Sequence, residues 1–230
     1  MTRSVILLFA GIVAAQAHDI ITTKITWSGE ISRLVYKRCS SCHREGGSSF
    51  SLMTYAEARP WAKAIKEEVL ERRMPPWNAV KGFGEFRDDR GLTQEEVELI
   101  SDWVEGGAPE GDPKYLPPLP RPAAWQDPVV PPGTSELVVS GDTRLASSAG
   151  VVAIRAKILK PGVSVLIVAM LPDGTVEPLL WIYQYKPDFK RTYYYRTPID
   201  LPAGTRVEMS PADAGAVALF TKNTATASLR

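Results

Sequence analysis

The sequence predicts an α+β multidomain fold in which an N-terminal all-α domain precedes a C-terminal all-β sandwich. Apolar residues in the first half recur at intervals of three and four, as in amphipathic helices. Beyond a stretch dense in proline they form short strand-like runs, separated by turn sequences such as Asp-Gly at 173–174. These changes predict a helical domain over residues 18–108, a Pro-rich linker over 109–132 and a β-sandwich domain over 133–230.

The overall composition is that of an ordinary globular protein. The chain has 230 residues, of which 44% are hydrophobic and 23% charged, and its formal net charge is +1. So balanced a charge argues against a nucleic-acid-binding surface and a polybasic membrane patch, because both need an excess of lysine and arginine. We therefore expect no nucleic-acid partner.

The first residues have the pattern of a secretory signal peptide. Arg3 precedes an apolar run over 5–15, and Ala-Gln-Ala at 15–17 has the small-x-small form of a cleavage site. The run is shorter than the roughly 20 residues that a spanning helix needs, and no later segment is long and apolar enough to span. We therefore expect residues 1–17 to be removed and the mature protein to be exported, for example to the periplasm. Retention of this segment as a membrane anchor is the alternative.

A helix is predicted to lead into the pentapeptide Cys-Ser-Ser-Cys-His at 39–43. Counting from Ile31, an apolar residue and then two cysteines follow at intervals of four, four and three. Because positions with this spacing share one face of a helix, Cys39 and Cys42 are expected on the apolar face.

Two further helical stretches are predicted before the linker. Residues 55–73 carry apolar residues among charged ones, and Pro60 suits only the first turn of that helix. The other helix begins at Thr-Gln-Glu-Glu, residues 93–96, which has the form of a capping box. An apolar stripe follows, and Gly-Gly at 106–107 ends the helix.

Cys-x-x-Cys-His is the attachment signature of c-type haem. When both cysteines share a helix face, their sulfurs can form thioethers along one porphyrin edge, and His43 then projects beneath the iron as the proximal ligand. A redox-active cysteine pair is the chief alternative, although no thioredoxin-like βαβ pattern surrounds it. A zinc site needs about four ligands, and His18 is the only other histidine. Cys39 and Cys42 are therefore predicted to bind one haem c covalently.

The distal iron ligand must come from elsewhere, because no histidine follows residue 43. Met74 opens the sequence Met-Pro-Pro-Trp, in which proline disfavours a helical conformation before it and stiffens the loop. Its thioether is predicted to ligate the iron, with Trp77 packed against the macrocycle or the core. The alternatives are Met53, a lysine, water or His18, and a Met74 that only fills space.

Residues 28–108 resemble a class I cytochrome c domain. The likeness rests on the pentapeptide at 39–43 at the end of a helix, on Met-Pro at 74–75 and on the closing helix TQEEVELISDWV. Between the pentapeptide and Met-Pro the chain is shorter than in that family, which leaves room for few intervening helices.

This resemblance implies a cytochrome c fold in which the first and last helices pack together, with Val35 or Tyr36 against Trp103. It also implies one-electron transfer. Ligand chemistry agrees, because an iron held by His43 and Met74 has no vacant site for a substrate.

Residues 178–211, from PLLWIYQY to RVEMSP, resemble the β-sandwich of exported bacterial proteins that pair a cytochrome c module with a copper type II, ascorbate-dependent monooxygenase-like domain. Such copper sites use histidine and methionine ligands. Since no histidine follows His43, Met170 and Met209 would be the only ligands of this kind in the β domain, and they cannot form such a site alone. After cleavage His18 would be N-terminal and could chelate copper, but a second free histidine would be needed. The resemblance therefore implies the fold without its copper.

The sequence as a whole predicts an exported monohaem c-type cytochrome that transfers single electrons with an unidentified redox partner protein. No catalytic constellation is found, so the chain is interpreted as an electron carrier rather than an enzyme, and the β-sandwich as a docking domain. The tyrosines at 193–195 are interpreted as sheet packing. An electron-delivering accessory subunit of an exported oxidoreductase and a haem-free thiol–disulfide protein are the alternatives.

Overall fold

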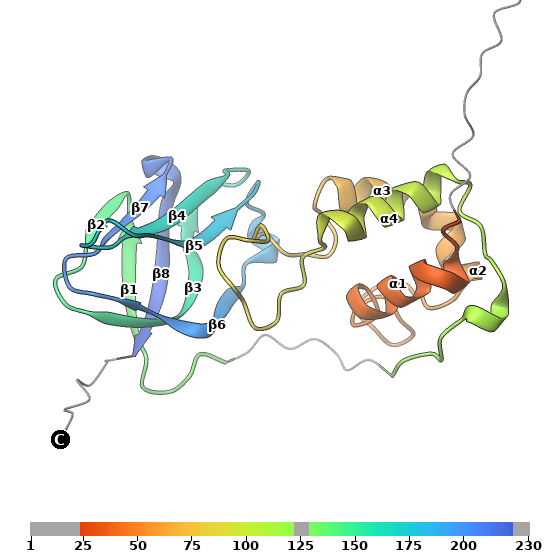
Figure 1. Cartoon of the computed structure of the whole chain (residues 1–230), viewed down its shortest axis with the longest axis horizontal. Coiled ribbons are helices and arrows are strands. Elements are labelled where there is room, and N and C mark those ends of the chain that lie inside the picture. Colours follow the sequence, from red (N-terminus) through yellow and green to blue (C-terminus); the bar gives the residue numbers. More distant parts are fainter. Residues whose placement is uncertain (1–23, 122–128, 223–230) are drawn as a thin grey trace, which may run out of the picture.

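The computed structural model describes residues 24–121 and 129–222 (Figure 1). The predicted signal peptide at 1–17, His18 and part of the predicted linker lie outside the described residues. No helix in the described ranges is long and apolar enough to cross a membrane.

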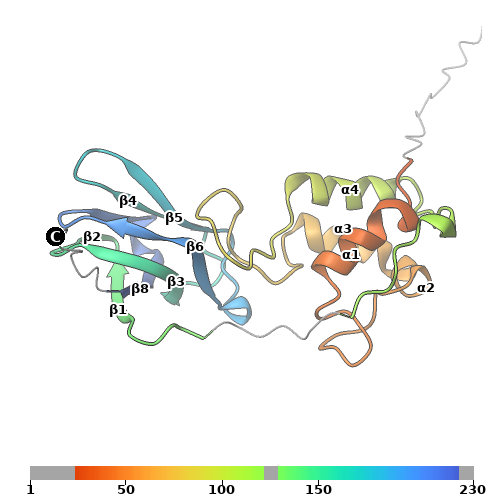
Figure 2. The same cartoon turned by 60° about the horizontal axis from the view of Figure 1, so that its bottom comes forward.

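The chain has an α+β fold, with a small helical region and an antiparallel β-sandwich lying next to each other (Figures 1 and 2). At this level the predicted fold class is confirmed. The helical region consists of a π-helical turn, four α-helices and a connecting 3₁₀ turn among the described residues: Trp27–Ile31, α1 Ser32–Arg38, α2 Tyr55–Ala58, the 3₁₀ turn Arg59–Trp61, α3 Ala62–Leu70 and α4 Gln94–Glu105.

The two helical stretches predicted before the linker differ in outcome. The stretch predicted at 55–73 is divided into α2 and α3 by the 3₁₀ turn that contains Pro60, because proline lacks the amide hydrogen that a continuous helix would use. The capping box of α4 is confirmed. The Thr93 hydroxyl accepts from the Glu96 amide at 3.1 Å, and the Glu96 carboxylate accepts from the Thr93 amide at 3.0 Å.

Two apolar clusters hold the helical region together. Val35 of α1 and Trp103 of α4 are buried in the first, with Tyr36 packed against it. The second joins α1, α3 and α4 through Leu34, Val69 and Ile100. The indole Nε1 of Trp103 donates to the carbonyl of Pro109 at 3.0 Å, and that carbonyl also accepts from the Trp27 amide at 3.0 Å. The beginning of the predicted linker is therefore fixed against the helices.

The β-sandwich consists of two four-stranded antiparallel sheets, in the strand orders β1-β8-β3-β6 and β2-β7-β4-β5. Its strands are β1 Ser135–Ser140, β2 Asp142–Arg144, β3 Ala149–Leu159, β4 Val165–Met170, β5 Val176–Ile182, β6 Thr192–Leu201, β7 Arg206–Ser210 and β8 Gly215–Lys222. Tyr193 and Tyr195 are buried in the core of the sandwich, and Tyr194 packs in a separate cluster with Phe220. The interpretation of these tyrosines as sheet packing is confirmed.

A loop of the helical half completes the sandwich. We call residues 77–87 the bridging segment; it is the loop that reaches from the helices to the strands in Figures 1 and 2. Backbone hydrogen bonds join Val80 to Trp181 of β5 at 2.8 Å and Arg87 to Tyr194 of β6 at 2.8 Å. Since β5 and β6 are edge strands of the two sheets, the bridging segment covers one edge of each sheet.

The predicted resemblance to a class I cytochrome c domain is wrong for this fold. Within the described residues the α-helices are only 7, 4, 9 and 12 residues long. The chain after Met74, expected to close over a haem within the helical domain, instead leaves the helices. It does so because the side chains of Trp77 and Phe86 are buried in the core of the sandwich.

Candidate functional site

The pentapeptide at 39–43 forms a tight turn at the end of α1. Helix α1 ends at Arg38, and the amides of Cys42 and His43 both donate to the carbonyl of Cys39, at 3.1 and 2.9 Å. The helix that was expected to carry both cysteines therefore stops before them, and a turn brings Cys42 and His43 back toward Cys39.

The two thiols are not joined by a disulfide and differ in environment. Cys39 packs against the apolar cluster that contains Val35 and Trp103. Burial, and next the neighbouring Cys42, raise the pKa of the Cys39 thiol to about 12, against the opposing charges of Arg38 and Arg90. Reactive cysteine pairs have at least one thiol with a lowered pKa, commonly at a helix N-terminus. Here the pair follows a helix C-terminus, and the pKa of its first thiol is raised rather than lowered.

Cys42 has a more polar environment. Burial alone would raise the pKa of its thiol, but hydrogen bonds from Ser48 and Ser41 and the positive charge of Arg90 outweigh burial and lower it. The Arg90 guanidinium also donates to the Ser41 hydroxyl. Arg90 precedes α4, so the turn of the pentapeptide is attached to a segment far along the sequence.

The imidazole of His43 is oriented by the loop that follows it. The Nδ1 of this imidazole lies 3.0 Å from the carbonyl oxygen of Phe50. The backbone carbonyl of His43 accepts from the Leu52 amide at 3.3 Å. Because a carbonyl oxygen can only accept, a neutral imidazole in this position carries its proton on Nδ1 and a lone pair on Nε2. The Phe50 ring meets the imidazole edge-on, with 5.0 Å between centroids, and lies against Trp61.

Gly47 makes this loop possible. A Cβ at Gly47 would lie 2.2 Å from the carbonyl oxygen of Cys42, far inside any real contact, so only glycine fits there. The neighbouring Gly46 has φ +67° and open space around it. The Gly-Gly pair at 46–47 was not recognised in the sequence as part of the site, although it was a readable signal of a close backbone approach.

The two methionines considered as distal iron ligands, Met53 and Met74, line different pockets. Met53 lines an open groove of about 450 Å³ together with Arg44 and Leu119. Met74 is 38% exposed and lines a small cavity of about 30 Å³ between the helices and the sandwich, beside Trp77 and Leu92. Neither lining includes Cys39, Cys42 or His43. The structure thus brings together three of the four predicted site residues and does not place Met74 in contact with them.

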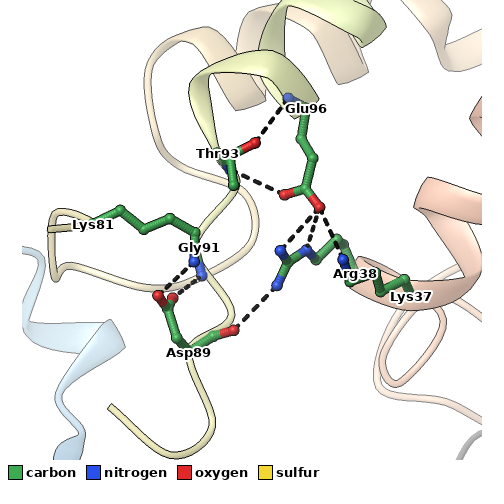
Figure 3. A network of polar contacts seen from close by, with 7 residues as sticks. All are labelled: Lys37, Arg38, Lys81, Asp89, Gly91, Thr93 and Glu96. Carbon is green, nitrogen blue, oxygen red and sulfur yellow. Dashed lines mark hydrogen bonds and ion pairs between the residues drawn. The ribbon is translucent and has the colours of Figure 1, made fainter. Parts of the chain in front are cut away.

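A polar network fixes the end of α1, as Figure 3 shows. Arg38, the residue before Cys39, donates from Nε and Nη2 to the Glu96 carboxylate, at 3.0 and 2.9 Å. Its Nη1 also donates to the carbonyl of Asp89 at 3.1 Å, and the Asp89 carboxylate pairs with Lys81 of the bridging segment. Sequence reasoning missed this network, because the capping box identified Glu96 but nothing local indicated its partner.

The two methionines considered for copper, Met170 and Met209, lie in different surroundings. Met209 is buried in the core of the sandwich, whereas Met170 ends β4 and is only partly buried. Across the described ranges, no group of three or more histidine, cysteine, aspartate or glutamate side chains could hold a metal ion.

Comparison with known proteins returns no relative: no family model, curated protein or solved structure matches the chain. Both resemblances inferred from the sequence are therefore corrected, the class I cytochrome c domain and the sandwich of copper type II, ascorbate-dependent monooxygenase-like proteins. The first rested on three short motifs within residues 28–108, and the second on residues 178–211. What the structure establishes is the coarser pattern of short helices beside an antiparallel sandwich. The contacts around residues 39–43 described above do not depend on either resemblance.

Proposed function

We propose that this chain binds one haem c through Cys39 and Cys42, with His43 as an iron ligand, and exchanges single electrons with a partner protein. The observation that carries the proposal is the state of His43. Its Nδ1 lies 3.0 Å from the Phe50 carbonyl oxygen, so that in the neutral imidazole Nε2 is the nitrogen that can ligate iron.

The orientation of His43 fits a metal-bound imidazole. Histidines that bind metals almost always donate their second ring N–H to a carboxylate or a backbone carbonyl, which fixes the tautomer and raises the basicity of the ligating nitrogen. The Phe50 carbonyl provides this contact without any titratable partner. The Gly-Gly turn at 46–47 serves to bring that carbonyl within reach.

The two thiols fit attachment better than disulfide exchange. They lie within one tight turn with His43, which is the grouping that two thioethers and one iron ligand require. The thiol–disulfide alternative is disfavoured, because the pair follows the C-terminal end of α1, where the helix dipole does not stabilise a thiolate.

Met74 remains our proposed distal ligand. Met53 belongs to the loop whose Phe50 carbonyl contacts Nδ1 of His43, and its own carbonyl accepts from the Tyr36 hydroxyl at 3.0 Å. Because Met53 is fixed within the loop that orients the proximal histidine, we favour Met74. Met74 is also 38% exposed, which is unusual for a methionine that only fills a core.

Bound haem c supplies one-electron exchange between Fe(III) and Fe(II), and methionine ligation raises its reduction potential. The chain's own contribution is to retain the group and to hold His43 in one tautomer. Retention by two covalent bonds suits a dilute exported compartment, which the pattern of residues 1–17 predicts. The redox partner is an unidentified protein. The alternative function is that of an accessory subunit that supplies electrons to an exported oxidoreductase.

The decisive experiment is expression of the full chain with a signal sequence and haem-maturation machinery. We expect haem that survives acid–acetone extraction and a denaturing gel, at one per chain. Cys39→Ala and Cys42→Ala should each leave a single thioether and a shifted α band, and His43→Ala should abolish assembly. Ser49→Ala is the matched control in the same loop. Wild-type protein that lacks extraction-resistant haem while the machinery matures a known c-type cytochrome would overturn the proposal.

A further inference from the structure

We infer that the β-sandwich positions Met74, and that Asn78 is the main positioning residue. The sandwich would then be part of the redox site rather than an appended docking domain. This inference rests on the proposed function, because it concerns the ligand that Met74 offers to the iron.

The residues after Met74 are fixed to the sandwich one after another. The carbonyl of Pro76 accepts from Nε of Arg191 at 3.3 Å. The ring of Trp77 packs edge-on against Tyr193, with 4.9 Å between centroids, and Trp77 is 7% exposed. Only Pro75 separates Met74 from the first of these contacts.

Asn78 has the most specific contacts of the segment. It is 6% exposed, and its amide nitrogen donates to the carbonyls of Lys186 and Phe189 at 3.3 and 3.4 Å. Its amide oxygen accepts from the Lys186 amide at 3.3 Å, and its backbone carbonyl accepts from the Tyr183 amide at 3.1 Å. A buried amide whose donor and acceptor are both used defines one position of the backbone. Asn78 therefore fixes the chain to the connection between β5 and β6.

The residues before Met74 are fixed to the helical region. The amides of Arg73 and Met74 both donate to the carbonyl of Glu68, at 2.8 and 3.1 Å. The Arg73 guanidinium also pairs with the Glu68 carboxylate at 2.9 and 3.0 Å. Met74 thus lies between two anchors, the C-terminal end of α3 on one side and the sandwich on the other.

Two anchors matter for a thioether ligand because the iron–sulfur bond is easily displaced by competing ligands. Each residue that must be ordered to bring the sulfur to the iron carries a cost in conformational entropy. A segment already held on both sides has lost that freedom before the bond forms, so the methionine competes better. Releasing the sandwich anchor should therefore weaken Met74 against an added ligand while leaving Cys39, Cys42 and His43 unchanged.

The test uses the oxidised holoprotein of the full chain, titrated with imidazole as the competing ligand. The readouts are the near-infrared charge-transfer band of the iron–methionine bond and the reduction potential, neither of which reports general stability. Asn78→Ala should lower the imidazole concentration at half displacement by about fivefold or more, the effect of losing one to two hydrogen bonds. Arg191→Ala, which removes a contact from a partly exposed side chain, should lower it by about threefold.

The matched control is Val139→Ala, which removes two buried methyl groups from β1, at the opposite edge of the same sheet from β6. It should leave the imidazole titration unchanged. Equal titrations of Asn78→Ala and wild type would overturn the inference, and so would a Val139→Ala shift as large as that of Asn78→Ala. A charge-transfer band that survives Met74→Ala would overturn it by removing Met74 from the iron. Wild type without covalent haem would instead overturn the proposed function, and this inference with it.

Discussion

Glu96→Ala probes how the cysteine turn is held in the helical region. The Glu96 carboxylate accepts from the Thr93 amide at 3.0 Å within the capping box. It also accepts twice from Arg38, the residue before Cys39. The Arg38 and Glu96 side chains are only 11% and 16% exposed, so the pair is screened less by water than a surface ion pair.

The expected loss follows from these two contacts. Removing the capping-box acceptor costs about 0.5–1 kcal/mol. Leaving a largely buried guanidinium without its carboxylate costs about 1.5–3 kcal/mol, the range for hydrogen bonds to charged groups. We therefore expect Glu96→Ala to lower the free energy of unfolding by about 3 kcal/mol, and the Tm by about 6–12 °C for a chain of this length.

Thermal unfolding of the full chain, followed by far-ultraviolet circular dichroism, measures this loss. Glu96→Gln keeps an oxygen for the Thr93 amide but loses the charge, so it should fall about halfway between wild type and Glu96→Ala. Glu98→Ala is the matched control. Its carboxylate accepts from the Gln94 side chain on the exposed face of α4, and its loss should change the free energy of unfolding by less than about 0.5 kcal/mol.

The contribution of Glu96 to the free energy of unfolding should be lost as the pH falls. Burial would raise the pKa of Glu96, but the Thr93 amide and Arg38 outweigh it, and the pKa in the folded protein is lowered. A carboxylate of this kind stabilises the fold above its unfolded pKa of about 4.3, and the contribution is lost as the pH falls through the lower folded value. Wild type and Glu96→Ala should therefore converge in acid. Equal Tm values of Glu96→Ala and Glu98→Ala at neutral pH would refute the reasoning.

Three further predictions concern the site and the bridging segment. In haem-free protein at pH 8, Cys42 should be alkylated at least about a hundredfold faster than Cys39, because a pKa of about 12 leaves Cys39 with almost no thiolate; equal rates by mass spectrometry would contradict this. Gly47→Ala should abolish haem attachment, since its Cβ would meet the Cys42 carbonyl at 2.2 Å, whereas Gly46→Asn, at φ +67° with open space, should retain it on a haem-stained gel. Trp77→Ala should cost about 3–5 kcal/mol in denaturant unfolding; a loss below about 1 kcal/mol would show that its burial in the sandwich is unimportant.

Features set by local chemistry could be predicted from the sequence. The start of α4 followed from a threonine and a glutamate three residues apart, because both hydrogen bonds of a capping box form within one turn. The break at Pro60 was not predicted, although the missing amide hydrogen was a local signal for it. The strand-like runs after the linker became the sandwich because their apolar residues bury one face against a second sheet. The pentapeptide at 39–43 was recognised for the same reason, as a motif of short spacing.

Features set by pairing across the chain could not be predicted. Trp77 and Phe86 read as residues of the helical domain, yet their partners are Tyr193 and Tyr195, more than a hundred positions later. The partner of Arg38 is Glu96, and the acceptor for His43 is a backbone carbonyl that any residue at position 50 would provide. A single sequence carries no record of such pairs. The expected cytochrome c domain was wrong for this reason, since it kept residues 77–87 within the helical domain, whereas they pair with the sandwich.

The contacts join the pentapeptide to the sandwich in a continuous series, which changes how the two halves relate. Arg38 connects the end of α1 to Glu96 and to the backbone of Asp89, and Asp89 connects to Lys81 in the bridging segment. The bridging segment then pairs with an edge strand of each sheet. If the halves were separated, the helical half would expose Trp77, and the sandwich would expose two sheet edges, which favour aggregation. The chain is therefore better treated as one structural unit, in which the sandwich edge contacts the segment that follows Met74.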